Sequence, residues 1–251
     1  EPLLYPPLVE LIQELIQRRK HLYLCTNGLL LPKVLPRLRP SPRLTLSVHL
    51  DGLAPTHDHI IGRPGGFRQV LEAIKQAKAA GFQVCTNTSI YRESKVEEIR
   101  QLFTLLTDLG IDGLMVSPAF NFEPIAADYF LSREEIRQKF RELTAPGQRF
   151  RFYNSPLYLE FLRGERQYDC TPWANPTRNP VGWRSPCYQI ADQHFPTFAE
   201  MMAQTPWEHY GVERDPRCRQ CLMHSGFEPT IVRSLSRDWR GLWAMLRWHL
   251  S

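Results

Sequence analysis

Four cysteines in the second half of the chain are spaced in a way that suits metal binding. Cys218 and Cys221 form a C-x-x-C pair within the turn-rich stretch RDPRCRQC. Two thiolates at this spacing can reach one metal, and Cys170 and Cys187 could complete a tetrahedral set. The pattern predicts a zinc site or an auxiliary iron-sulfur cluster. The alternative, four buried thiols that bind no metal, stays open.

Polar residues follow three short apolar runs of the first half. They are Thr26–Asn27, His49 with Asp51, and Asn87–Thr88. Open α/β sheets and α/β barrels build their sites at the carboxyl ends of parallel strands. Any one pair could be an ordinary turn, but three together favour a site. No G-x-G-x-x-G, Walker or H-E-x-x-H motif occurs, so we expect binding at strand ends.

The elements that must position these residues alternate between helix and strand. Apolar residues recur at helical spacing over 8–15, 70–77 and 96–106. Between and after these stretches, HLYLCTNG, RLTLSVHLDG, FQVCTNTSI and GLMVSP are typical of strands, and the second of them alternates polar and apolar faces. This order predicts an α/β fold with a parallel sheet wrapped by helices.

Composition limits the function classes. The chain has 251 residues, 43% of them apolar, which suffices for one large domain or a domain with an appendage. The net charge of +5 is mild and spread along the chain, so it does not indicate nucleic-acid binding. No run approaches 18 apolar residues, as a membrane span requires. Six cysteines without a visible secretory signal favour a reduced compartment, and we expect a cytoplasmic protein.

The motifs of the first half resemble those of radical S-adenosylmethionine (radical SAM) enzymes. EPLLYPPLVELI, LYLCTNGLLL, the segment from LSVHLDG to CTNTSI, and LMVSP occur in the order found after the family's Gly-Gly-Glu-Pro motif. The resemblance implies that Glu1-Pro2 completes that motif. We then expect a CxxxCxxC loop, which holds the 4Fe-4S cluster, in a missing upstream segment, and no activity from the fragment alone.

The second half resembles the hopanoid-biosynthesis radical SAM family, the adenosylhopene synthases. The similarity lies in YDCTPWANPTRNPVGWRSPCYQI, HFPTFAEMMAQTPWEHYG and RDPRCRQCLMHSGFEPT. It implies a partial (β/α) barrel of radical SAM type over residues 1–125, with a Cys-containing C-terminal extension over 126–251. One departure is Ser225, where the family is expected to have Cys.

The resemblance also implies a reaction. The enzyme would be a transferase that adds a 5'-deoxyadenosyl radical from SAM to the alkene of diploptene, forming adenosylhopane. The implied partners are a hydrophobic triterpene (hopene) substrate and an external electron donor such as flavodoxin or ferredoxin.

The resemblance implies SAM contacts at six residues. These are Glu1, Thr26, Asn27, His49, Asn87 and Ser117. Glu1 would meet the methionine ammonium group, since an ammonium prefers a carboxylate. Asn87 and Ser117 would line the adenosine side. His49 stands where related enzymes often have Ser, so a SAM contact and a half-buried structural histidine both stay open.

Cys25 directly precedes the Thr26–Asn27 pair, so we expect it near the cofactor end of the barrel. Addition of an adenosyl radical to an alkene leaves a carbon-centred radical. A nearby thiol can quench it, which makes Cys25 the predicted catalytic residue. Its alternative role is a small buried hydrophobe within a strand.

Three further patterns are interpreted more simply. His57, Asp58 and His59 are adjacent on an expected loop and should point apart, so we expect no metal there. The stretch from Ser132 to Glu135 predicts a helix capping box. Aromatic residues after the expected boundary suit either a core or an apolar substrate wall: Phe150, Phe152, Tyr153, Tyr158, Phe161, Trp173 and Trp183.

The C-terminal stretch RDWRGLWAMLRWHL predicts an amphipathic helix. Its apolar stripe consists of Trp239, Leu242, Trp243, Leu246 and Leu250, with arginines largely off it. Such a helix either docks on its own domain or makes peripheral contact with an anionic membrane.

Two alternatives to adenosyl transfer stay open. The first is a radical SAM enzyme that abstracts hydrogen or modifies a peptide. The second is a non-catalytic, metal-binding scaffold.

Overall fold

The computed structural model describes residues 1–120 and 129–250, which form two compact units. Unit 1 comprises residues 1–90, 94–117 and 147–153, and unit 2 comprises 91–93, 118–146 and 154–251 as far as they are described. The predicted boundary at 125/126 lies outside the described residues. The return of residues 147–153 to unit 1 was not anticipated.

Unit 1 is built on a four-stranded sheet in the order β1-β2-β3-β4. Its strands are β1 (Leu22–Thr26), β2 (Leu44–His49), β3 (Gln83–Ile90) and β4 (Gly113–Pro118). Strands β1, β2 and β3 pair in parallel. The main helices are α1 (Leu8–Gln17), α2 (Leu31–Val34), α3 (Ala54–Ile60), α4 (Gly66–Ala79) and α5 (Val96–Asp108). The predicted α/β fold with a parallel sheet is confirmed.

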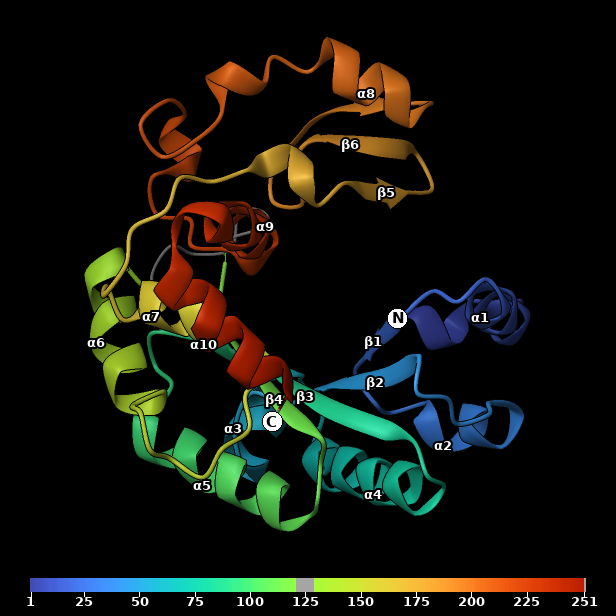
Figure 1. The fold of residues 1–251 in the computed structure, drawn as a ribbon. Coiled ribbons are helices and arrows are strands. Elements are labelled where there is room, and N and C mark those ends of the chain that lie inside the picture. The colour runs from blue at the N-terminus through green and yellow to red at the C-terminus, as the bar shows by residue number, and fades with distance from the viewer. Residues whose placement is uncertain (121–128, 251) are drawn as a thin grey trace. The chain divides into compact units, whose positions relative to one another are not determined.

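Helices α1, α2, α4 and α5 lie along the outer side of the curved sheet in Figure 1. The apolar alternate positions of β2, including Leu46 and Val48, are fully buried. Helix α4 buries Val70 and Ile74 from the stripe that the sequence indicated. Burial of this one apolar face leaves the polar residues of the strands on the inner face.

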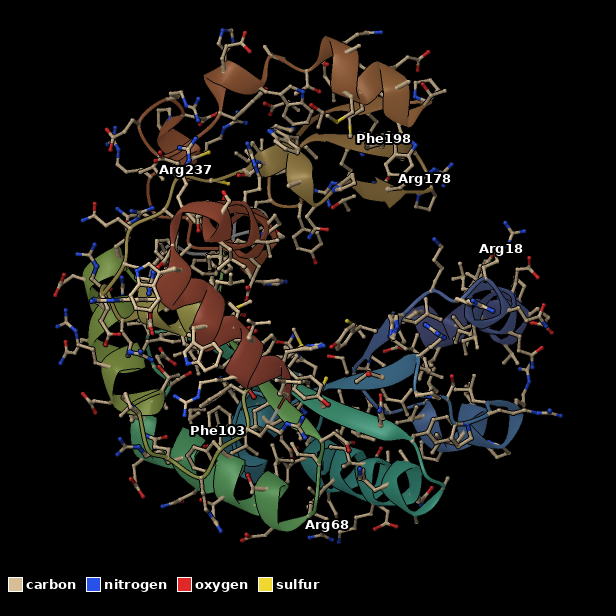
Figure 2. The ribbon with its side chains drawn as sticks, viewed as in Figure 1. Arg18, Arg68, Phe103, Arg178, Phe198 and Arg237 are labelled. Carbon is tan, nitrogen blue, oxygen red and sulfur yellow. The ribbon has the colours of Figure 1, made fainter. Side chains whose placement is uncertain are left out.

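Residues 147–153 extend unit 1 beyond β4. The Leu114 N–H donates to the Arg151 carbonyl at 2.8 Å, and the Tyr153 N–H donates to the Leu114 carbonyl at 2.7 Å. Phe103 of α5, labelled in Figure 2, makes edge contacts with Phe150 and Phe152 at ring distances of 5.6 and 5.8 Å. Three of the aromatic residues that the sequence assigned to the C-terminal extension, Phe150, Phe152 and Tyr153, therefore belong to unit 1.

Unit 2 combines helices with a small antiparallel sheet. Its elements are α6 (Arg133–Leu143), α7 (Pro156–Leu162), β5 (Thr177–Asn179), β6 (Gly182–Pro186), β7 (Ala191–Phe195), α8 (Phe198–Gln204), α9 (His224–Ser234) and α10 (Trp239–Leu250). The predicted capping box is confirmed at the start of α6. The core of unit 2 includes the tilted rings of Phe161 and Phe227, whose centroids lie 4.5 Å apart. Elsewhere in unit 2, Trp183 packs on Phe198.

The C-terminal helix α10 contacts α7 at Gly241. Gly241 is buried and a Cβ there would lie 3.0 Å from Leu157. The predicted apolar stripe is exposed, with Trp239 at 74% and Leu250 at 85% of their maximal exposure. Within the described residues no helix has the length and apolarity needed to cross a membrane.

The prediction that His57, Asp58 and His59 lie on a loop is wrong, because they lie in helix α3. The side chains do diverge: His57 is buried, whereas Asp58 accepts backbone hydrogen bonds from Gly65 and Phe67. Among the described residues, no three His, Cys, Asp or Glu side chains form a group ready to hold a metal ion.

Candidate functional site

The carboxyl ends of the strands of unit 1 bring Glu1, Thr26 and Asn27 together. The Thr26 hydroxyl donates to Glu1 Oε1 at 2.9 Å, and the Asn27 backbone N–H donates to Glu1 Oε2 at 2.9 Å. The Leu3 N–H also donates to Oε1, at 3.0 Å. This network fixes the Glu1 carboxylate at the end of β1.

The Glu1 carboxylate keeps acceptor capacity in this network. A carboxylate offers about four lone-pair sites, and three bonds to Glu1 are formed here. The remaining site lies on a residue that is exposed. The free acceptor site of the Glu1 carboxylate therefore fits an ammonium group such as that of SAM.

His49 is paired with a buried carboxylate. Its Nε2 lies 2.6 Å from Asp51 Oδ2, and the Ser89 N–H donates to Asp51 Oδ1 at 2.8 Å. Burial lowers the pKa of His49, but the hydrogen bond and charge of Asp51 outweigh burial and leave that pKa raised. Because Nε2 is engaged, a SAM contact from His49 would have to use Nδ1.

His57 lies behind this pair as a buried neighbour. Its Nδ1 accepts a 3.3 Å hydrogen bond from the Asp51 N–H, and burial lowers the pKa of the ring. The Asp51 carboxylate therefore faces one histidine whose charged form is favoured and one whose neutral form is favoured. Sequence reasoning noted Asp51 but did not anticipate His57 beside it.

Asn87 and Ser117 occupy the positions that the resemblance implied. Asn87 pairs in register with His49 across β2 and β3, and Ser117 is the penultimate residue of β4. Both are half-buried. Thr26, Asn27, His49 and Ser117 thus lie at the carboxyl ends of strands of one sheet and Glu1 is bonded to such an end, whereas Asn87 lies within β3, level with the end of β2.

Strand register also forms a row of Cys25, Ser47 and Cys85. Cys25 is level with Ser47, and Ser47 is level with Cys85. Cys25 is exposed, whereas Cys85 is fully buried. Desolvation raises the pKa of the Cys25 thiol, and Ser47 opposes this shift. Burial raises the pKa of Cys85 to about 12, so both thiols are protonated at neutral pH.

Ser47 is a member of this row that sequence reasoning did not select. Its buried hydroxyl lies close enough to the Cys25 and Cys85 thiols to oppose the rise of their pKa values. Alternation within RLTLSVHLDG put Ser47 on the face of His49, but only the register put it beside Cys25.

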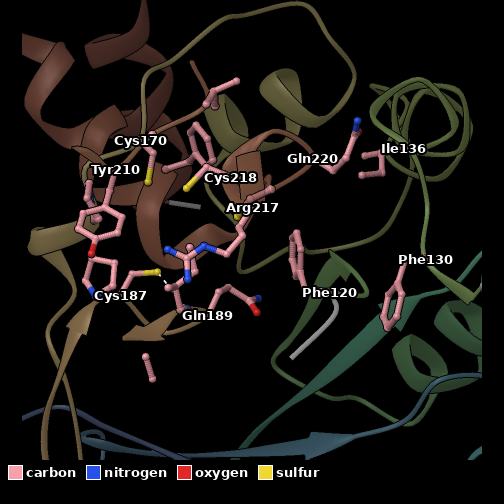
Figure 3. Close-up of a pocket in the computed structure, with 18 of the residues that line it drawn as sticks. Phe120, Phe130, Ile136, Cys170, Cys187, Gln189, Tyr210, Arg217, Cys218 and Gln220 are labelled. Carbon is pink, nitrogen blue, oxygen red and sulfur yellow. Dashed lines mark hydrogen bonds between the residues drawn. The ribbon is translucent and has the colours of Figure 1, made fainter. Parts of the chain in front are cut away.

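In unit 2, the four predicted metal ligands all line one cavity of about 520 Å³. Figure 3 shows Cys170, Cys187 and Cys218 with their sulfurs directed into the same region. All four cysteines are free and partly exposed. The cavity has a second, apolar side, where Phe120, Phe130 and Ile136 lie.

The cavity environment affects the four thiols unequally. Burial, with a smaller effect of the neighbouring thiols, raises the pKa of Cys170 and raises that of Cys221 to about 12, although the Met223 N–H opposes the shift at Cys221. Burial also raises the pKa of Cys218, while a hydrogen bond from the Gly211 backbone opposes the shift. Without a bound metal these three groups are thiols, not thiolates, at neutral pH.

Two family profiles match successive parts of the chain. The radical SAM superfamily profile matches residues 1–106, and a domain of unknown function, DUF3463, matches residues 114–245. The first part thus belongs to the radical SAM superfamily, and the second is a DUF3463 domain. Membership implies SAM and a 4Fe-4S cluster, and no CxxxCxxC motif occurs in the 251 residues.

Curated relatives include enzymes of molybdenum cofactor biosynthesis. GTP 3',8-cyclase of Alkaliphilus metalliredigens is 29% identical over 183 residues, 68% of this chain and 57% of the relative. Molybdenum cofactor biosynthesis protein 1 of Mus musculus is 30% identical over 115 residues, 45% of this chain and 18% of the relative. The chain thus spans well under two thirds of these relatives.

A solved structure supports the fold. SuiB of Streptococcus suis has a TM-score of 0.52 at 16% identity, over 66% of this chain and 40% of that one. This similarity fits the predicted partial (β/α) barrel of radical SAM type. The superfamily prediction is confirmed, whereas the narrower resemblance to the hopanoid family stays a prediction, since none of these relatives bears such a name.

Proposed function

We propose that this protein is a radical SAM transferase that joins the 5'-deoxyadenosyl group of SAM to the alkene of diploptene, yielding adenosylhopane. SAM with a reduced 4Fe-4S cluster supplies the radical chemistry. The observation that carries the proposal is the position of Cys25. Its thiol is exposed, and it directly precedes Thr26 and Asn27, which hydrogen-bond to Glu1.

The binding role belongs to the Glu1 network. Glu1 would accept a hydrogen bond from the methionine ammonium of SAM, and Thr26 and Asn27 would hold the carboxylate in place. Asn87 and Ser117 would contact the adenosine. A charge-assisted bond of this kind is stronger and more directional than a neutral one.

Cys25 would act as the hydrogen donor. Radical addition forms a C–C bond and leaves an unpaired electron on the neighbouring carbon of the substrate. Hydrogen transfer from the Cys25 S–H would complete the product and leave a sulfur-centred radical. One electron from an external donor of the flavodoxin or ferredoxin class, and one proton, would restore the thiol.

The substrate, a polycyclic hydrocarbon, requires apolar surroundings. The exposed stripe of α10 would rest on an anionic membrane, where such a substrate dissolves, with Arg240 and Arg247 near the headgroups.

A second candidate is cyclisation of GTP, which the names of the curated relatives favour. A triphosphate requires several uncommitted cationic groups. In the cavity of unit 2, however, the Arg217 guanidinium already donates to Asp192 and Asp215. This engagement disfavours a triphosphate in that cavity.

Product analysis tests the proposal. Full-length protein, loaded with the 4Fe-4S cluster of its CxxxCxxC motif, would be incubated with SAM, a reductant and either diploptene or GTP, and the products separated by liquid chromatography and mass spectrometry. We expect adenosylhopane, with little free 5'-deoxyadenosine, because transfer consumes the adenosyl group. Stoichiometric 5'-deoxyadenosine without adduct would indicate hydrogen abstraction, and a cyclised guanosine product would establish the second candidate.

A further inference from the structure

The four cysteines of unit 2 reach one cavity from three separate segments. Cys170 follows α7, Cys187 follows β6, and Cys218 and Cys221 bracket a turn before α9. The Cys221 N–H donates to the Cys218 carbonyl at 3.0 Å, which closes that turn. Chance burial of unrelated thiols would not direct all of the second-half cysteines into one cavity.

Local structure fixes two of the sulfurs. The Ile190 N–H donates to Cys187 Sγ at 3.4 Å, and the Met223 N–H donates to Cys221 Sγ at 3.5 Å. Amide N–H groups directed at cysteine sulfur stabilise the thiolate form and tune iron-sulfur clusters. These turns are therefore preorganised for thiolate ligands.

A glycine makes room for the Cys170 sulfur. A Cβ at Gly226 of α9 would lie 2.4 Å from Cys170 Sγ, which no real contact allows. The Thr171 N–H also donates to the Gly226 carbonyl at 3.1 Å. The segment of Cys170 is thus held against α9 with its sulfur in a space that any larger residue would fill.

The arrangement of the four cysteines favours a cluster over a single ion. Zinc needs its ligands about 2.3 Å from one point, and among the described residues no three potential ligands are grouped so closely. A 4Fe-4S cluster distributes four thiolates over four irons and needs room between them. A cavity of about 520 Å³ with the sulfurs on its wall meets that need.

We infer that Cys170, Cys187, Cys218 and Cys221 bind a 4Fe-4S cluster in unit 2. Ser225 is not among the residues that line the cavity, so the departure at that position removes none of the four ligands. The inference goes beyond the proposed function and does not depend on which substrate the protein uses.

Anaerobic reconstitution of the 251-residue chain with iron and sulfide tests the inference. The only other cysteines are Cys25 and Cys85, so no CxxxCxxC cluster can contribute. We expect about four irons and four sulfides per chain, the content of one such cluster. Cys218→Ser and Cys221→Ser should each lower the iron bound per chain well below that of the parent, because each removes one thiolate ligand of the cluster. Cys25→Ser is the matched control and should retain the full iron content.

Alkylation of the unsubstituted chain provides a test that does not depend on how the variants fold. Iodoacetamide should modify the four cavity cysteines before reconstitution, slowly because burial raises the pKa of three of them, but not after it, while Cys25 reacts in both states. Equal labelling of the four in both states would overturn the inference. So would one zinc per chain with no iron, or undiminished iron in the Cys218 and Cys221 variants.

Discussion

The Thr26 hydroxyl donates a 2.9 Å hydrogen bond to Glu1 Oε1 across 25 positions of sequence. The bond ties the first residue of the chain to the end of β1. In the proposed function, it sets the position of the carboxylate that meets the SAM ammonium.

Thr26→Val should therefore weaken SAM binding. The substitution keeps the shape of the side chain and removes the donor to Glu1. A hydrogen bond to a charged group contributes about 1.5–3 kcal/mol, so we expect an affinity loss of at least about tenfold by equilibrium dialysis. Thr45→Val is the matched control, because Thr45 lies near the start of β2, away from the carboxyl ends of the strands. Equal SAM affinity in the two variants would show that the Thr26 hydroxyl does not position Glu1.

Cys25→Ala should separate SAM cleavage from product formation. Without the thiol, full-length protein loaded with the 4Fe-4S cluster of its CxxxCxxC motif should still cleave SAM but give less adenosylhopane and more 5'-deoxyadenosine or other shunt products. Cys85→Ala is the control, because its thiol is fully buried and cannot meet a substrate. Wild-type product ratios in the Cys25 variant would assign this residue to packing and require another reductant.

The His49–Asp51 pair should make the stability of the fold depend on pH above 6.5. Because Asp51 raises the pKa of His49 in the folded state, the pair stabilises the fold fully below the unfolded value of 6.5. That stabilisation is lost as pH rises through the higher folded pKa. The buried His57, with its lowered pKa, acts in the opposite sense, on the acid side of 6.5.

Urea unfolding of His49→Gln against the parent measures this effect. The parent should lose stability between pH 6.5 and higher pH, and the variant should lose less. His209→Gln is the control, since that ring is 71% exposed and its nearest carboxylate is 3.8 Å away. Parallel pH profiles for parent and His49→Gln would rule out the pair as the origin of the dependence.

Gly113→Ala should destabilise unit 1. A Cβ at this position would lie 2.1 Å from the Tyr153 ring. Overpacking of this kind typically costs about 1–3 kcal/mol in the free energy of unfolding. In a Tyr153→Ala background the same substitution should cost clearly less, since the clashing ring is gone. Additive effects in this double-mutant cycle would contradict the packing of residues 147–153 on β4.

The exposed stripe of α10 should bind anionic lipid. We expect the protein to float with vesicles containing phosphatidylglycerol, and replacement of Trp243 and Leu246 by Asp to reduce that flotation severalfold by removing buried apolar area. Val181→Asp, at another exposed apolar residue, should have no effect. Flotation that is unchanged by the α10 substitutions would limit this helix to its contact with α7.

Local patterns determined the elements and their faces. Alternation in RLTLSVHLDG correctly placed Leu46 and Val48 in the core, helical spacing placed Val70 and Ile74 against the sheet, and the residues from Ser132 to Glu135 cap α6. These features depend on neighbours within a few residues, because the side-chain period of a strand or helix is set by local backbone geometry.

Only the tertiary structure decided which distant residues meet. Sequence spacing could not show that Cys25 lies level with Ser47, that residues 147–153 return to β4, or that His57 lies in a helix behind Asp51. The four cysteines were candidates by residue type, but their convergence depends on how β6, α9 and the segment after α7 pack. Register and packing are set by contacts between segments far apart in the chain, and such contacts leave no periodic signal in the sequence.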